Sequence, residues 1–132
     1  MRYLLDTNIV SDLVRNPQGK VAERIAIVGE ESVCTSIIVA AELQYGAAKK
    51  NSARLTAQLE SVLGALEILP FETPAEVIYG HLRARLEAAG KLIGGNDMLI
   101  AAHAISLAHT IVTDNEREFS RVDGLHVENW FR

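Results

Sequence analysis

Short apolar runs alternate with longer helical patterns along this chain, and that alternation limits the folds it can adopt. A strand that is followed by a helix and then by another strand is typical of a parallel sheet covered by helices. The sequence therefore predicts an α/β fold, a central parallel sheet of about four to five strands flanked by helices. The predicted strands are Arg2 to Leu5, Ser32 to Thr35, Glu67 to Leu69, Thr110 to Thr113 and Leu125 to Val127.

Helix signals are clearest in the second half of the chain. The stretch from Pro74 to Ala89 is predicted as a helix with Thr73 as N-cap, proline at its first position and Gly90 at its end. The apolar stretch 97–104 predicts a buried helix, with Asn96 as its cap. Three further helices are expected, at 9–14, 39–49 and 51–66.

The size and composition of the chain fit one folded domain, residues 1–132. Its 132 residues are 48% hydrophobic, with a net charge of −4, which argues against bulk electrostatic attraction to nucleic acid. An anionic substrate would need a local source of positive charge, such as a metal ion or a basic patch. The single cysteine, Cys34, excludes a disulfide framework and is expected to be a buried, reduced core residue. No signal peptide or membrane-spanning stretch is expected, so the default location is cytoplasmic.

Four acidic positions recur where strands end or helices begin: Asp6, Glu42, Asp97 and the pair Asp114-Asn115. Open α/β sheets place their ligands at the carboxyl ends of the strands. Each position also has an ordinary explanation. Asp6 or Asn8 and Asp97 could serve as helix caps, Glu42 could be a solvated surface residue, and Asp114-Asn115 could be a turn.

Several carboxylates that converge at one sheet edge raise one another's pKa unless a counter-charge is present. A hard divalent cation, Mg²⁺ or Mn²⁺, supplies that charge and prefers oxygen ligands. Such a site can activate water against a phosphodiester. The four histidines show no metal-binding spacing, and His103 is expected to be a satisfied core residue.

Four blocks of this sequence, taken in order, resemble the signature blocks of PIN-domain proteins, and most closely those of VapC-type toxins of bacterial toxin–antitoxin pairs. The blocks are Leu4 to Asn8, Ala41 to Gly46, Gly94 to Ala104, and Val112 to Asn115 with Glu118-Phe119. The resemblance covers essentially the whole chain. It implies a Mg²⁺-dependent endoribonuclease, usually a homodimer, that a VapB-like antitoxin holds inactive and that cuts RNA, with a transfer RNA loop as the family-level expectation.

The resemblance also assigns roles to individual residues. Asp6 and Asp97 would be the principal metal ligands, and Glu42 a further ligand or a positioner of the attacking water. Asn8 and Thr113 would support them by hydrogen bonds. Many relatives have an aspartate where this chain has Asn115, so Asp114 and Glu118 are both candidates for a fourth acid.

Two other functions compete with the nuclease. A phospho-accepting receiver domain has a similar size and an acidic pocket, but its late-strand lysine has no counterpart here. A catalytically silent PIN-fold module that binds RNA or protein is the remaining alternative. Seven basic side chains could contact the phosphates of an RNA or could be ordinary solvated charges: Arg15, Lys49, Lys50, Arg54, Arg83, Arg85 and Lys91.

Overall fold

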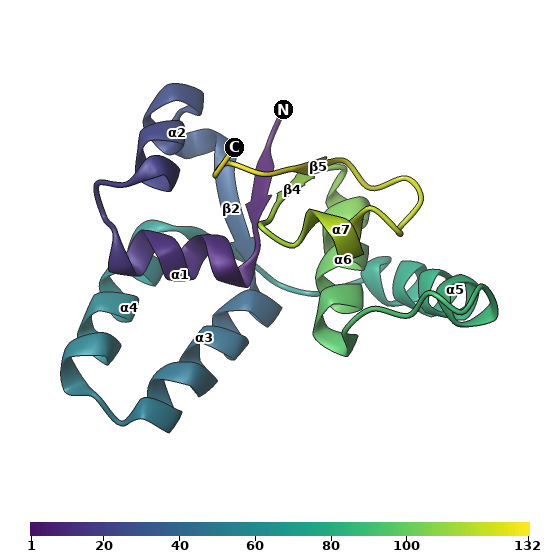
Figure 1. The fold of residues 1–132 in the computed structure, drawn as a ribbon, viewed down its shortest axis with the longest axis horizontal. Helices are drawn as coiled ribbons and strands as arrows, with labels where there is room; N and C mark the ends of the chain where they lie inside the picture. Colours follow the sequence, from purple (N-terminus) through teal and green to yellow (C-terminus); the bar gives the residue numbers. More distant parts are fainter.

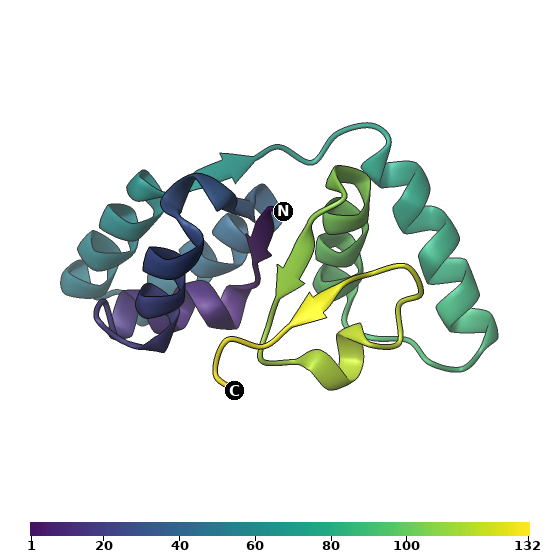
Figure 2. The same ribbon diagram turned by 90° about the horizontal axis from the view of Figure 1, so that it is seen from above.

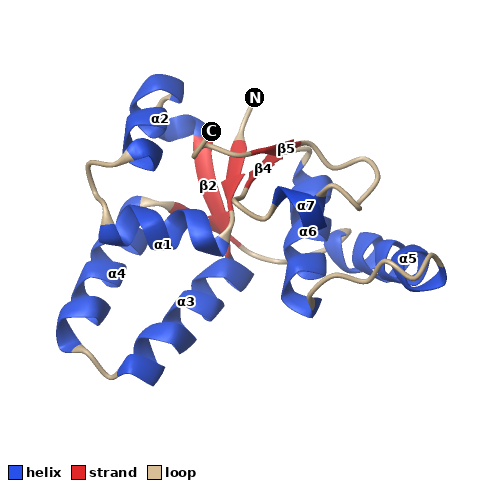
Figure 3. Ribbon diagram, in the orientation of Figure 1, coloured by secondary structure: helices blue, strands red, loops and turns tan.

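A five-stranded parallel sheet lies at the centre of the computed structural model, which describes residues 1–132 (Figures 1 and 3). The strand order is β3-β2-β1-β4-β5. Leu5 of β1 is in register with Thr35 of β2 and Val112 of β4, so these three strands end at the same edge. The strands are β1 (Tyr3–Leu5), β2 (Val33–Ser36), β3 (Glu67–Leu69), β4 (Thr110–Val112) and β5 (Val127–Glu128). Each predicted strand overlaps an observed one, although β5 shares only Val127 with the predicted range.

Seven α-helices surround the sheet, and they divide into two groups. Figures 1 and 2 show α1 to α4 on one side of the molecule and α5 to α7 on the other, with the strands between them. The helices are α1 (Thr7–Arg15), α2 (Lys20–Val28), α3 (Ile37–Lys50), α4 (Ala53–Ala65), α5 (Ala75–Ala88), α6 (Gly95–Leu107) and α7 (Glu116–Phe119). A short 3-10 turn, Glu30–Ser32, precedes β2.

The core lies on both faces of the sheet, because helices cover both. The central strands are accordingly apolar on both sides, as parallel sheets require. Leu4, Leu5 and Ile111 are fully buried. Cys34 is a buried free thiol, and burial raises its pKa to about 11, as expected for an inert core residue. The predicted buried helix is also confirmed, since most of the residues from Met98 to Ala104 in α6 are buried.

The structure differs from the sequence-based prediction mainly in the residues that cap the helices. α1 begins at Thr7, so Asn8 lies inside the helix. α6 begins at Gly95 with Gly94 as the cap residue, which places Asn96 inside its first turn. α5 begins at Ala75, and the hydroxyl of Thr73 donates to the Glu76 carboxylate instead of capping the backbone. In each case the side chain has another partner or points to solvent, so local cap preference does not decide the boundary.

The C-terminal end of α5 lies where the sequence predicts it. Gly90 has a φ of +68°, the left-handed conformation that glycine adopts at little cost, and it ends the helix as predicted. The helix α2 has no counterpart among the predicted elements. None of the helices combines the length and the apolar character needed to cross a lipid bilayer.

Candidate active site

Asp6 lies where β1 ends and α1 begins, and it is almost completely buried, with 3% of its surface exposed. It occupies the cap position of α1, but its side chain makes no capping hydrogen bond. Oδ2 accepts a 2.8 Å hydrogen bond from the Thr113 hydroxyl, whereas Oδ1 is buried without a partner. Burial raises the pKa of Asp6. A buried carboxylate oxygen without a partner is costly, so this atom fits a ligand better than a cap.

Thr113 follows β4 directly and is fully buried beside Asp6. Besides donating to Asp6, its hydroxyl accepts a hydrogen bond from the backbone N–H of Asn115 at 2.9 Å. One threonine therefore fixes the orientation of the Asp6 carboxylate and the start of the following loop.

Asp97 lies in the first turn of α6 and is partly buried. Its pKa is raised to about 6, first by burial and then by the negative charges of Asp6, Glu42 and Glu118. Asp97 is thus close enough to the other three carboxyl groups to be affected by their charge, although the four lie in different parts of the chain. Gly94 leaves room for the Asp97 side chain, because a Cβ at Gly94 would lie 3.2 Å from Asp97 Oδ2.

Glu42 lies in the second turn of α3 and is partly exposed. Its Oε1 accepts a 2.7 Å hydrogen bond from the hydroxyl of Thr7, in the first turn of α1. The side chain is therefore held toward the end of β1 by a partner on another helix. A freely solvated glutamate would not need this contact.

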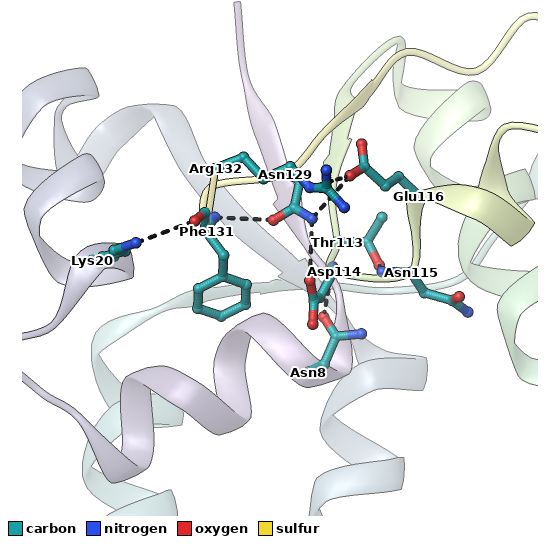
Figure 4. Close-up of polar contacts among 9 residues, drawn as sticks. All are labelled: Asn8, Lys20, Thr113, Asp114, Asn115, Glu116, Asn129, Phe131 and Arg132. Atoms are coloured by element: carbon teal, nitrogen blue, oxygen red, sulfur yellow. Dashed lines mark hydrogen bonds and ion pairs between the residues drawn. The ribbon is translucent and has the colours of Figure 1, made fainter.

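The two acidic side chains of the fourth sequence block have different partners. Asp114 is exposed and points toward the C-terminal segment, where its Oδ1 accepts from Asn129 Nδ2 at 3.1 Å (Figure 4). Its backbone N–H donates to Asn8 Oδ1 at 3.1 Å. Glu118 instead accepts from Asn115 Nδ2 at 3.3 Å and contributes to the raised pKa of Asp97. Of the two candidates for a fourth acid, only Glu118 contributes to the raised pKa of Asp97.

The C-terminal segment forms a second layer of contacts that the sequence did not reveal. Asn129 also donates to Glu116 Oε1 at 3.2 Å, and Arg132 forms an ion pair with the same carboxylate at 2.7 Å (Figure 4). Lys20 donates to the backbone carbonyl of Phe131 at 3.3 Å. Through Asn129 and Arg132, the C-terminal segment is bonded to the loop that follows Thr113. No sequence motif links these residues, because they lie in irregular segments that come together only in the folded chain.

His103 is buried in α6, as expected of a core residue, but only one of its two ring nitrogens has a partner. Its Nδ1 lies 2.8 Å from the Ser36 hydroxyl, and that hydroxyl accepts from the Ile38 N–H and so caps α3. Its Nε2 is buried without a partner. The histidine therefore joins the helix that carries Asp97 to the start of the helix that carries Glu42.

The arrangement fits a hard cation that keeps part of its water shell. No three His, Cys, Asp or Glu side chains converge closely enough to hold a metal ion by themselves. Mg²⁺ is commonly bound by one or two carboxylates and several waters, so the free Oδ1 of Asp6 and the half-buried Asp97 are suitable ligands. The absence of thiolate and histidine ligands disfavours zinc.

The predicted basic residues are not gathered around the acids. Only Arg15 and Lys50 line a groove that begins at Thr7 and Glu42. Arg83 is hydrogen-bonded to Tyr79 on α5, and Arg85 and Lys91 border a different depression. Any local attraction of an anionic polymer next to the acids must therefore come from a few side chains.

Comparison with known proteins agrees with this geometry. The family model described as PIN domain matches residues 3–125. The chain is 41% identical to ribonuclease VapC2 of Rickettsia felis over 132 residues, which cover 98% of both chains. It is 36% identical to the tRNA(fMet)-specific endonuclease VapC of Shigella flexneri, again over 98% of both.

A solved structure is similar over the same length. The crystal structure of VapBC2 from Rickettsia felis, bound to a DNA fragment from its promoter, superposes with a TM-score of 0.91 at 38% identity. It covers 98% of this chain and 99% of the other. The five-stranded sheet with acids at its carboxyl edge defines a PIN-type nuclease domain. The chain belongs to the PIN-domain family, and within it to the VapC-type toxin ribonucleases.

Proposed function

We propose that this protein is a Mg²⁺-dependent endoribonuclease toxin that a VapB-like antitoxin keeps inactive. The observation that carries the metal dependence is the pairing of Asp6, with one buried oxygen left free, and Asp97, whose carboxyl group is crowded by three other acids. Mn²⁺ fits the same ligands. The nuclease class follows from the family.

Asp6 and Asp97 would hold the ion, which when bound lowers the pKa of water and stabilises negative charge on a phosphodiester. Thr113 keeps Asp6 in place through the bond to Oδ2, so Oδ1 stays directed to the site. Glu42, oriented by Thr7, positions the attacking water and accepts its proton. Asn115 and Glu118 complete the site from the loop after β4, while Asn8 anchors that loop.

We propose tRNA(fMet) as the first substrate to test, because a relative of 36% identity is named for it. Recognition of a single-stranded loop within a folded RNA is the usual mode of sequence-specific RNA binding. The antitoxin is proposed because the similar structure is a VapBC complex. Action in the cytoplasm, where transfer RNA takes part in translation, and assembly as a homodimer are parts of the same proposal. Exposed apolar side chains on α3 and α5, such as Tyr45 and Val77, are consistent with the dimer.

The decisive experiment incubates purified protein with a panel of transfer RNAs, with Mg²⁺ or with excess EDTA. We expect site-specific cleavage that requires the metal and is lost in Asp97→Asn. Circular dichroism of the variant controls for folding. If the wild type cuts nothing, or if Asp97→Asn cuts equally well, the proposal fails. A wild type that binds RNA without cutting it would instead support a catalytically silent binding module. Light scattering of the purified protein tests the homodimer.

A further inference from the structure

A groove of about 250 Å³ runs away from the acidic site between α1 and α3, with α4 beneath it. It begins at the hydrogen-bonded pair of Thr7 and Glu42. In Figure 1 these three helices lie together on the side of the sheet opposite α5. The groove is therefore continuous with the proposed catalytic residues.

Two matching rows of residues form its walls. Thr7, Ser11 and Arg15 are spaced four apart on α1, and Glu42, Gly46 and Lys50 have the same spacing on α3. Residues four apart lie on the same face of a helix. Apolar side chains make up the rest of the lining: Val14, Leu43, Ala47, Leu55 and Leu59.

The charge along the groove changes from one end to the other. The first and last residues of each row are eight positions apart, so at about 1.5 Å per residue the cations lie about 12 Å from the acidic end. Arg15 and Lys50 are exposed and form no ion pair within the chain. Their guanidinium and ammonium groups are therefore free to bind an external anion.

We infer that a single-stranded segment of the RNA substrate lies in this groove, with a backbone phosphate bound between Arg15 and Lys50 and a nucleotide resting on the apolar lining. This inference rests on the proposed ribonuclease function and adds to it a subsite outside the acids. The groove supplies the local positive charge that a chain of net charge −4 otherwise lacks. Phosphate contacts of this kind position a strand without reading its sequence.

The absence of a side chain at Gly46 keeps the groove open. A Cβ at this position would meet no atom within 4 Å, so a side chain here would begin in open space at the wall of the groove. Glycine in the middle of a helix is also unfavourable for stability. Gly46→Leu should therefore block RNA while leaving the melting temperature unchanged or higher. Gly64 on α4 has the same open surroundings outside the groove, which makes Gly64→Leu the matched control.

The test measures RNA affinity by fluorescence anisotropy in the Asp97→Asn background, so that RNA remains uncut. The probes are a labelled anticodon stem-loop of tRNA(fMet) and a labelled oligouridine. For Arg15→Gln combined with Lys50→Gln, we expect about tenfold weaker binding of both probes and a salt dependence reduced by about 0.7 in log–log slope, because one phosphate contact is lost. As a control of equal charge, Lys49→Gln combined with Arg54→Gln removes two positive charges from residues that do not line the groove, and should change affinity by less than about twofold.

The same measurements distinguish an error in the proposed groove from an error in the proposed nuclease function. Unchanged affinity in both the double variant and Gly46→Leu would overturn the groove, even if wild-type protein cleaves RNA. Variants that keep normal RNA affinity but no longer copurify with a co-expressed antitoxin would assign the groove to that protein instead, and would also overturn the inference. If the wild type neither binds nor cuts RNA, the function itself is wrong.

Discussion

The hydroxyl of Thr113 donates a 2.8 Å hydrogen bond to Oδ2 of Asp6, although the two residues are 107 positions apart in the chain. The bond crosses from the end of β4 to the end of β1, at the centre of the sheet. It fixes one oxygen of the carboxylate and leaves the other, Oδ1, without a partner. The geometry of the site thus depends on how these two strands pair.

Replacing Thr113 by valine should destabilise the protein and impair the site. The change keeps the shape of the side chain, but leaves Asp6 Oδ2 and the Asn115 N–H without their partner. A buried polar group without a partner costs about 1–3 kcal/mol in unfolding free energy. Urea denaturation measures this loss. Thr113→Ser retains the hydroxyl and should recover most of it. Equal losses in both variants would mean that the methyl group, rather than the hydrogen bond, is important.

Replacing Asp97 by asparagine should abolish cleavage and yet stabilise the metal-free protein at pH 7. The folded-state pKa of about 6 lies above the ordinary value, so the stability contributed by this group is fully present below pH 3.8 and is lost as the pH rises through about 6. Asparagine imitates the neutral form. Allowing for solvent screening, we expect a gain of about 1 kcal/mol at pH 7 and little difference near pH 4. Chemical denaturation in EDTA at both pH values checks this. A destabilised variant at pH 7 would indicate that Asp97 serves mainly as a helix-terminal charge.

Addition of Mg²⁺ should raise the melting temperature of the wild type. A ligand at about ten times its Kd adds about 1.4 kcal/mol to stability, which corresponds to about 5 °C for a domain of this size. Differential scanning fluorimetry with and without 10 mM MgCl₂ measures the shift, with KCl at equal ionic strength as the control. Asp6→Asn and Asp97→Asn should show no specific shift. A response of the same size in these variants would place the ion elsewhere.

Replacing Glu42 by glutamine should lower the cleavage rate by about 100-fold, the usual range for loss of a proton acceptor. Thr7→Val should give a smaller loss, about tenfold, because the carboxylate remains but is no longer held by the 2.7 Å bond. Thr7→Ser keeps the donor and should cleave at nearly the wild-type rate. Single-turnover cleavage separates these effects from RNA binding. A fully active Glu42→Gln would remove this residue from the mechanism.

His103 should make the protein less stable in mild acid. Burial lowers its pKa, so the folded state holds it neutral while the unfolded chain takes up a proton below about pH 6.5. The stability that the neutral ring contributes is present above that pH and is lost as the pH falls. Because other groups titrate in the same range, the difference in unfolding free energy between wild type and His103→Gln isolates the effect. This difference should shrink between pH 7 and pH 5. A constant difference would contradict the buried neutral ring.

The sheet could be predicted from the sequence because each strand is a local apolar run, and burial on both faces allows no other pattern. Asp6, Glu42, Asp97 and Thr113 could be singled out because they follow such runs or lie among apolar neighbours. The groups that surround them could not. The direction of Asp114 depends on Asn129, the orientation of Glu42 depends on Thr7, and His103 meets Ser36 across 67 positions.

Helix starts were the least predictable local feature. Asn96 and Asn8 have favourable cap chemistry, yet Gly94 and Asp6 occupy the cap positions. At Gly94 the reason is space for the Asp97 carboxylate, and at Asp6 it is the bond to Thr113. Tertiary contacts at the site override local preference in both places. Two of the three misplaced caps therefore lie next to the acids, and the third is at Thr73.

The central place of β1 in the strand order has a consequence for synthesis on the ribosome. The strand that emerges first pairs with β4, which is made more than 100 residues later. Contacts so distant in the chain form late, and domains generally fold as units during translation. Asp6 therefore cannot acquire its neighbours until the nascent polypeptide has grown past Thr113. A ribosome-bound fragment shorter than this lacks the nuclease site, which delays any damage to the RNA pool until synthesis of the domain is nearly complete.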